Sequence, residues 1–138
     1  HQFMPKYELI HQEIDIKQDA EMVSDAERIG VILNNLISNA IRYSVTNRAE
    51  QAFMKINISN DENKALISVL DNGEGIEEEY HQKIFEMFFR ASSNARDGSG
   101  LGLFICKEVV EKLGGNIQLY SEKDKGSTFV VELPNLKE

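Results

Sequence analysis

Residues 53–71 carry the pattern that most restricts the fold of this chain. Met54, Ile56 and Ile58 alternate with polar residues, which is the period of a strand with one buried face. The turn-forming run NDEN follows, and ALISVL then predicts a second, more buried strand, so that the two form a β-hairpin. A closing hairpin is expected where NIQLY and STFVVELP flank SEKDKG. Two antiparallel hairpins are therefore the framework on which the remaining segments must pack.

Amphipathic helices accompany these strands. The first is expected over Asp25/Ala26–Ser44, with Asp25 placed to cap it. The second runs from about Gly100 to Leu113 and stops at two glycines. A short helix is plausible over Glu77–Phe85, and part of YELIHQEIDI fits an edge strand. Helices mixed with hairpins, without a regular βαβ alternation, predict an α+β sandwich with the helices on one face of a sheet.

Composition narrows the class of protein. The chain has 138 residues, of which 41% are hydrophobic and 28% charged, as expected for one globular domain. Its net charge of −8 argues against a nucleic acid partner. No apolar run has the length of a membrane span, and the N-terminus lacks the parts of a signal peptide. Cys106 is the single cysteine, which fits a reducing compartment and a small apolar filler on a helix. We therefore expect a cytoplasmic location and no direct membrane contact.

One face of the first helix carries an unusual set of side chains. At 100° per residue, Asn35, Ser38, Asn39 and Arg42 share a narrow face. The apolar positions Ile29, Leu33, Leu36, Ala40 and Tyr43 cover roughly the opposite face. The two amides and the guanidinium suit a metal–phosphate group, since an amide oxygen can ligate Mg²⁺ and arginine can contact phosphate oxygens. Taken alone, the same pattern also fits a polar surface stripe.

The segment DNGEGI places Asp71, Gly73 and Gly75 directly after an apolar strand. Glycine lets the chain turn with positive φ and lets a ligand approach the backbone. A carboxylate at Asp71 can accept a hydrogen bond from the exocyclic amine of adenine, and it would repel the carbonyl that guanine presents there. An ordinary Asp-Asn-Gly turn is the alternative.

The segment GSGLGL, residues 98–103, puts three glycines at the start of the second helix, where free N–H groups can bind an anion. A flexible helix cap is the alternative. Neither G-x-G-x-x-G nor G-x-x-x-x-G-K-[ST] occurs in the chain. The aromatic run IFEMFFR precedes the polar, glycine-bearing segment 91–99. We expect its rings to be core, or to anchor a lid formed by that segment.

The order of these motifs resembles the catalytic ATP-binding domain of sensor histidine kinases, a branch of the group with the Bergerat fold that also holds gyrase B, the Hsp90 chaperones and MutL. The resemblance covers roughly Asp25 to Leu133. It implies a two-layer α/β sandwich, with a mixed sheet under three helices. It also implies a single catalytic domain over residues 1–138, in which residues 1–9 are a linker from an absent dimerisation domain, since the missing initiator Met suggests a piece of a longer protein.

The resemblance assigns roles to individual residues. Asn39 matches the Mg²⁺-ligating asparagine, and Asp71 the aspartate that reads adenine. The residues that it implicates in catalysis or phosphate contact are Asn35, Arg42 and Arg90. The further residues that it places at the nucleotide are Tyr43, Gly73, Gly75, Ile76, Gly98, Gly100, Leu101, Gly102 and Thr128, with Phe85 and Phe88 in the aromatic box and Gly126 at the start of the last strand.

Asn35 occupies the position where gyrase and Hsp90 relatives carry a glutamate that activates water. Because an amide cannot accept that proton, the site is expected to hold Mg·ATP without hydrolysing it efficiently. The implied activity is transfer of the γ-phosphoryl to a histidine of a separate domain, followed by a response regulator. His1, His11 and His81 do not match the acceptor motif, so isolated activity is expected to be low. A serine kinase of the anti-sigma type and a non-catalytic nucleotide-binding module are the alternatives.

Overall fold

The computed structural model describes residues 6–46, 48–89 and 100–136. Five strands form one sheet in the order β1-β2-β3-β5-β4. Their bounds are β1 His11–Gln18, β2 Phe53–Asn60, β3 Lys64–Asp71, β4 Asn116–Glu122 and β5 Gly126–Pro134. β1 runs parallel to β2, whereas the other neighbouring pairs are antiparallel. The mixed sheet, both predicted hairpins and the edge strand near the N-terminus are thereby confirmed.

The alternation in the sequence sets which face of the sheet is buried. In β2, Met54 and Ile56 are buried, and in β3 the buried positions are Ala65, Ile67, Val69 and Asp71. The register pairs Ile56 with Val69 and Met54 with Asp71, so these side chains share one face. Asp71 thus lies at the end of an otherwise apolar row.

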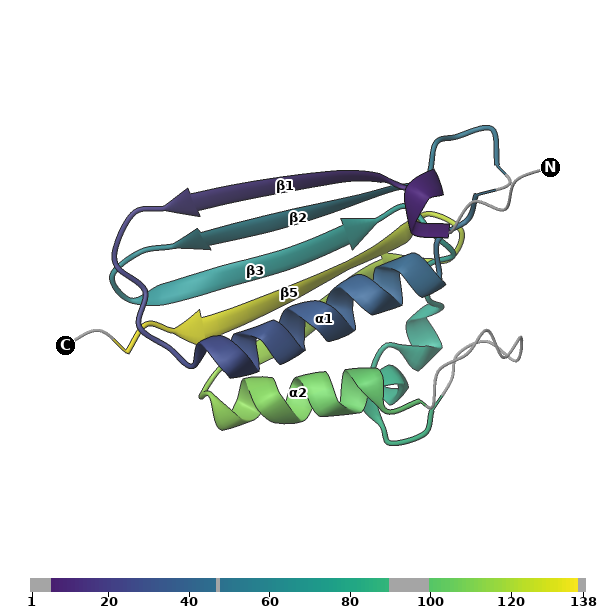
Figure 1. Ribbon diagram of the computed structural model, residues 1–138. Helices are drawn as coiled ribbons and strands as arrows, with labels where there is room; N and C mark the ends of the chain where they lie inside the picture. Colours follow the sequence, from purple (N-terminus) through teal and green to yellow (C-terminus); the bar gives the residue numbers. More distant parts are fainter. Residues whose placement is uncertain (1–5, 47, 90–99, 137–138) are drawn as a thin grey trace.

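Two α-helices cover that face, α1 over Ala26–Arg42 and α2 over Gly102–Lys112 (Figure 1). Asp25 caps α1 as predicted, since its carboxylate accepts a hydrogen bond from the N–H of Arg28 at 3.1 Å. The helices pack through Ile32 and Leu36 of α1 and through Cys106 and Val110 of α2. Burial raises the pKa of the Cys106 thiol to about 12, so this cysteine is the apolar filler that the sequence suggested. Neither helix combines the length and apolarity that crossing a membrane requires, and the same holds throughout the part of the chain that the structure describes.

The expected third helix is not formed. The segment Glu77–Phe85 instead makes two single turns of 3-10 helix, η2 over Glu78–Tyr80 and η3 over Lys83–Phe85. A helix of this length is marginal by itself, so tertiary contacts decide its conformation. Here the tertiary contact is the burial of Ile84 in the core, while the ring of His81 makes a local contact with the carbonyl oxygen of Ile76 at 2.9 Å. The sandwich therefore has two α-helices rather than three.

Residues Lys6–Leu9 form a further 3-10 turn, η1, within the segment expected to be a linker. The carbonyl oxygen of Leu9 accepts a hydrogen bond from the amide of Gln51 at 2.8 Å. The end of that segment is thus held against the residues that precede β2.

Candidate functional site

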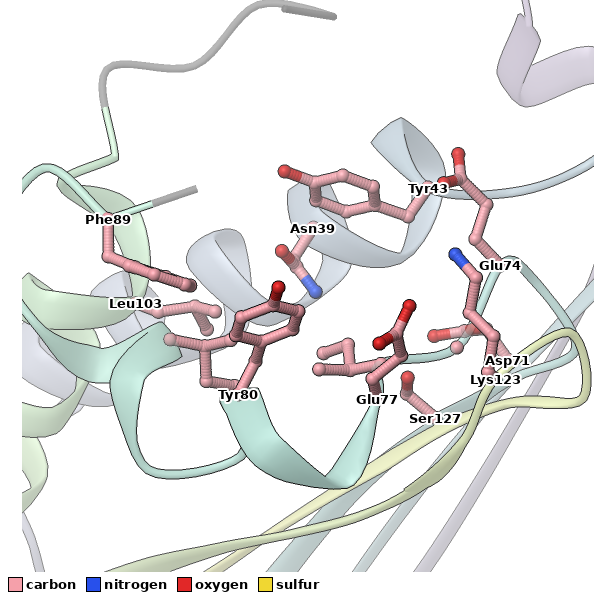
Figure 2. A pocket seen from close by; sticks show the side chains of 13 residues that line it. Asn39, Tyr43, Asp71, Glu74, Glu77, Tyr80, Phe89, Leu103, Lys123 and Ser127 are labelled. Carbon is pink, nitrogen blue, oxygen red and sulfur yellow. The ribbon is translucent and has the colours of Figure 1, made fainter. Parts of the chain in front are cut away.

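A cavity that is partly open to solvent lies between the C-terminal half of α1, the loop after β3, the η2–η3 segment and the start of α2. Apolar side chains and a few polar ones converge on it, as is typical of a small-molecule site. It is lined by Asn39, Tyr43, Asp71, Glu74, Gly75, Ile76, Glu77, Tyr80, Ile84, Phe89, Leu103, Lys123 and Ser127. Figure 2 shows the side chains of Asn39 and Tyr43 projecting from α1 into the same space as Asp71 and Ser127.

Asp71 is the carboxyl group at the floor of this cavity. Its side chain is 7% exposed, and Oδ1 accepts a hydrogen bond from the N–H of Gly73 at 2.9 Å. Burial raises the pKa of Asp71 to about 6, although the backbone N–H groups of Gly73 and Ser127 act in the opposite direction. At neutral pH the group is therefore mostly an anion that can accept a further hydrogen bond from a ligand.

Asn39 and Tyr43 lie one helical turn apart at the other wall. Asn39 is 8% exposed, which is unusual for an amide on a surface helix. The expectation that Tyr43 faces away from Asn39 is wrong, because residues four apart project on the same side of a helix. Both side chains are consequently available to one ligand.

The loop after β3 follows a path that only small residues allow. A Cβ atom at Gly73 would collide with the carbonyl oxygen of Tyr43. Gly75 has a positive φ of 69°, and a Cβ atom there would collide with the carbonyl oxygen of Glu122. The N–H of Glu74 donates to the carbonyl oxygen of Tyr43 at 3.0 Å. The two glycines therefore let the loop run between α1 and the β4–β5 hairpin.

Serines of the β4–β5 hairpin support the same loop. Ser121 Oγ accepts a hydrogen bond from the N–H of Ile76 at 2.8 Å and donates to the carbonyl oxygen of Gly126 at 2.9 Å. Its contact with Ser127 Oγ, at 2.8 Å, then uses the Ser127 hydroxyl as donor. The lone pairs of Ser127 remain available on the cavity side.

The structure does not bring every predicted residue to the cavity. Asn35 lies one turn before Asn39, and its amide donates to the carbonyl oxygen of Val31 at 2.9 Å. The guanidinium of Arg42 lies 3.4 Å from Ser38 Oγ on the exposed side of α1. Among the predicted glycine-segment and β5 residues, those that do not line the cavity are Gly73, Gly100, Leu101, Gly102, Gly126 and Thr128. Gly98, Arg90 and the proposed lid at 91–99 lie outside the described residues.

Thr128 does not line the cavity because of its position in the alternation of strand β5. Side chains alternate along β5, so the buried positions Ser127, Phe129 and Val131 face the helices. Thr128 lies between them and faces the opposite side of the sheet. Its neighbour Ser127 lines the cavity in its place.

The aromatic box divides between two environments. Phe85 packs edge-on against the core ring of Phe129, with 6.2 Å between ring centroids, and Phe88 is 65% exposed. Phe89, in contrast, lines the cavity beside Tyr80, with 5.7 Å between their ring centroids. The expectation that such rings are core holds for Phe85 but not for Phe88.

Sequence reasoning missed eight of the lining residues, namely Glu74, Glu77, Tyr80, Ile84, Phe89, Leu103, Lys123 and Ser127. Ser127 could have been found from the phase of the strand. Tyr80 and Lys123 carry no such signal, because irregular segments bring them to the cavity.

The sequence of this chain matches a known protein family and is similar to curated proteins. Residues 24–137 match the family described as histidine kinase-, DNA gyrase B-, and HSP90-like ATPase. The chain is 39% identical over 115 residues to the sensor protein SrrB of Staphylococcus aureus, which covers 80% of this chain and 19% of that protein. It thus spans about a fifth of the length of the curated relatives that it matches.

Solved structures share the fold. The catalytic domain of histidine kinase ThkA superposes with a TM-score of 0.72 at 32% identity, over 91% of this chain and 80% of that one. Full-length ShkA in complex with AMPPNP superposes with a TM-score of 0.77 at 26% identity, over 94% of this chain and 26% of that one. The expected Bergerat-type sandwich is confirmed. The chain therefore belongs to the histidine kinase-, DNA gyrase B- and HSP90-like ATPase family, and within it to the catalytic ATP-binding domains of the sensor histidine kinase type.

Proposed function

We propose that the domain binds ATP with Mg²⁺ in this cavity and transfers the γ-phosphoryl group to a histidine on a separate dimerisation domain. The observation that carries the proposal is that Asp71 and Asn39, 32 positions apart in the sequence, line one cavity. A carboxylate that can accept a hydrogen bond from a base and an amide that can ligate a metal thus lie at opposite walls of one partly open cavity.

Adenine would be held at the Asp71 end. The anionic carboxyl group would accept a hydrogen bond from the exocyclic amine, and it would oppose the carbonyl that guanine carries at that position. Ile76, Ile84 and Leu103 supply apolar walls for the ring, as purine binding requires. The complex of the relative ShkA with AMPPNP, an adenine nucleotide, supports this choice of ligand.

The residues present fit Mg²⁺ only as a metal shared with the nucleotide. Among the described residues no group of three or more His, Cys, Asp and Glu side chains could hold an ion, so a cage made of protein alone is not formed there. Mg²⁺ commonly takes one or two protein oxygens together with phosphates and water, and the amide oxygen of Asn39 suits that role. When bound, the metal would neutralise negative charge on the phosphate oxygens.

The side chains of α1 favour transfer over hydrolysis. Asn35 has an amide where a general base would be required, and its N–H already donates to the carbonyl of Val31. The two lining glutamates, Glu74 and Glu77, come from the loop after β3 and not from α1 beside Asn39. Arg42, after a change of rotamer, and Arg90 are proposed to contact phosphate oxygens. The partners that follow are the phosphoacceptor domain and a response regulator.

Calorimetry with and without Mg²⁺ tests the nucleotide site. Asn39→Ala should lose the Mg²⁺-dependent part of ATP affinity and keep its fold, whereas Asn34→Ala, an exposed asparagine of the same helix, should bind as the wild type does. An Asn39→Ala variant with full Mg²⁺-dependent affinity would remove the metal role.

Transfer is tested with labelled ATP and a domain that bears the cognate histidine. An acid-labile label on histidine is expected. An acid-stable label would identify a serine kinase of the anti-sigma type, and ATP binding without any transfer would identify a regulatory nucleotide-binding module.

A further inference from the structure

Arg48 lies in the connection between α1 and β2 and reaches across to the loop that follows β3. Its Nη1 donates to the carbonyl oxygen of Asn72 at 2.8 Å, and its Nη2 donates to the carbonyl oxygen of Gly73 at 3.1 Å. The guanidinium therefore holds two successive peptide groups that are distant in sequence. Neither the motif order nor the family resemblance pointed to this residue.

The side chain of Asn72 ties the same loop to the same connection. Its Oδ1 accepts a hydrogen bond from the N–H of Phe53 at 2.9 Å, and its Nδ2 donates to the carbonyl oxygen of Gln51 at 2.9 Å. Four hydrogen bonds thus join the loop to residues 48–53. The loop is therefore fixed to the connection between α1 and β2.

This attachment continues to the cavity through Gly73. The carbonyl of Gly73 accepts from Arg48, and its N–H donates to Asp71 Oδ1 at 2.9 Å. That N–H is also one of the two groups that lower the pKa of Asp71 against the effect of burial. The Asn72 carbonyl, which also accepts from Arg48, belongs to the same peptide group as that N–H. Arg48 therefore holds the peptide group that orients and stabilises the carboxylate, and the next one along the chain.

An arginine suits this task better than a lysine. The planar guanidinium presents parallel N–H groups that can bond two neighbouring carbonyls, whereas an ammonium group is a single point of charge. Gly73 is buried, so its carbonyl would lose its partner without easy access to water. The loop would then be free to shift, and the carboxylate with it.

We propose that Arg48 is a positioning residue for purine selectivity, which holds the Asn72–Gly73 backbone so that the Asp71 carboxylate meets the amine of adenine. The inference rests on the nucleotide-binding function proposed above. It adds a residue that touches neither the nucleotide nor the metal.

The test compares the affinities of the wild type, Arg48→Gln, Arg48→Lys and Arg28→Gln for Mg·ADP and Mg·IDP. IDP carries a carbonyl where ADP carries the amine. Arg28→Gln is the matched control, because Arg28 is an exposed arginine at the start of α1 that pairs with Asp25 at 3.6 Å. The folded state of each variant is checked by circular dichroism and thermal unfolding, and binding is measured well below the midpoint.

Arg48→Gln should bind ADP about tenfold more weakly, the loss expected for one well-made hydrogen bond, with IDP affinity nearly unchanged. The ADP/IDP ratio should fall accordingly, and Arg48→Lys should show most of that fall. A purely structural role would lower both affinities in proportion to the folded fraction and leave the ratio at its wild-type value.

A wild-type ratio in folded Arg48→Gln would overturn the inference while leaving nucleotide binding intact. If Arg48→Gln does not fold, the ADP/IDP ratio of Arg48→Lys tests the inference. A wild-type ratio in Arg48→Lys would overturn the proposal that Arg48 acts by bonding the carbonyls of Asn72 and Gly73. Failure of the wild type to bind either nucleotide would overturn the proposed function itself. Arg28→Gln should match the wild type in both affinities.

Discussion

Replacing Asp71 with asparagine should stabilise the fold at neutral pH while weakening the site. The carboxyl group is 7% exposed and has a pKa raised from 3.8 to about 6. A raised pKa means that the folded state disfavours the ionised form relative to the unfolded chain. Asparagine is nearly isosteric, keeps an oxygen that can accept from the N–H of Gly73, and carries no charge.

The size and sign follow from proton linkage. Roughly two pKa units at 1.36 kcal/mol per unit correspond to about 3 kcal/mol. Between about pH 4 and pH 6 the folded state binds more protons at Asp71 than the unfolded state, so the stability of the wild type falls as pH rises through this window. The neutral carboxyl contributes its full stability below pH 3.8, and that contribution is lost above pH 6. Asp71→Asn lacks this term, so the difference between the two proteins isolates it.

Urea unfolding of both proteins from pH 4 to pH 8 measures the effect. The free energy of unfolding of Asp71→Asn, relative to the wild type, should rise by about 2.5 kcal/mol between pH 4 and pH 8, mostly between pH 4 and pH 6, since about 0.5 kcal/mol of the full difference is already present at pH 4. Any effect of the amide that does not depend on pH cancels in this comparison. A difference constant within about 0.5 kcal/mol over the whole range would refute the argument that Asp71 is desolvated in the folded protein.

Three further outcomes are expected. ADP affinity should fall about tenfold from pH 7 to pH 5 as Asp71 is protonated, and Asp71→Asn, titrated with the same ligand, should lack that part of the dependence; equal pH profiles would contradict it. Ser127→Ala should weaken ADP binding in calorimetry, whereas Thr128→Ala, on the opposite face of the sheet, should not; the reverse order would restore the sequence-based assignment. Gly75→Ala should lower the free energy of unfolding by more than about 1 kcal/mol in urea, because a Cβ there meets the Glu122 carbonyl at a positive φ; a neutral effect would show that the loop relaxes.

The strands and helices were predictable because their signals are local. The alternation of Met54, Ile56 and Ile58 fixes a strand and its buried face, and Asp25 caps the helix that its position indicated. The order of motifs was enough to bring Asn39 and Asp71 to one site, since each motif lies at the end of a regular element.

The features that the sequence did not predict depend mainly on contacts between residues distant in sequence. The family resemblance points to Thr128 because a motif gives only an approximate position, whereas strand phase decides which residue faces the cavity, and that residue is Ser127. The predicted short helix did not form because burial of Ile84 in the core, which depends on residues distant in sequence, decides the conformation of the segment. Arg48 could not be found at all, since its partners lie 24 and 25 residues away and are backbone atoms that any sequence supplies.

The two ends of the cavity differ in what holds them, and this bears on how substitutions should act. The Asp71 end is built from strand termini and a loop joined by hydrogen bonds to α1, β2 and the β4–β5 hairpin. Because hydrogen bonds within the chain hold this end, binding of a nucleotide should cost little in ordering it. In the proposed reaction, contacts to the base would not change as the γ-phosphoryl group is transferred. Changes at Asp71 or Ser127 should therefore raise the KM for ATP and the Kd for ADP together and leave kcat nearly unchanged, whereas a change at Asn39, which faces the phosphates in the proposed function, should also lower kcat.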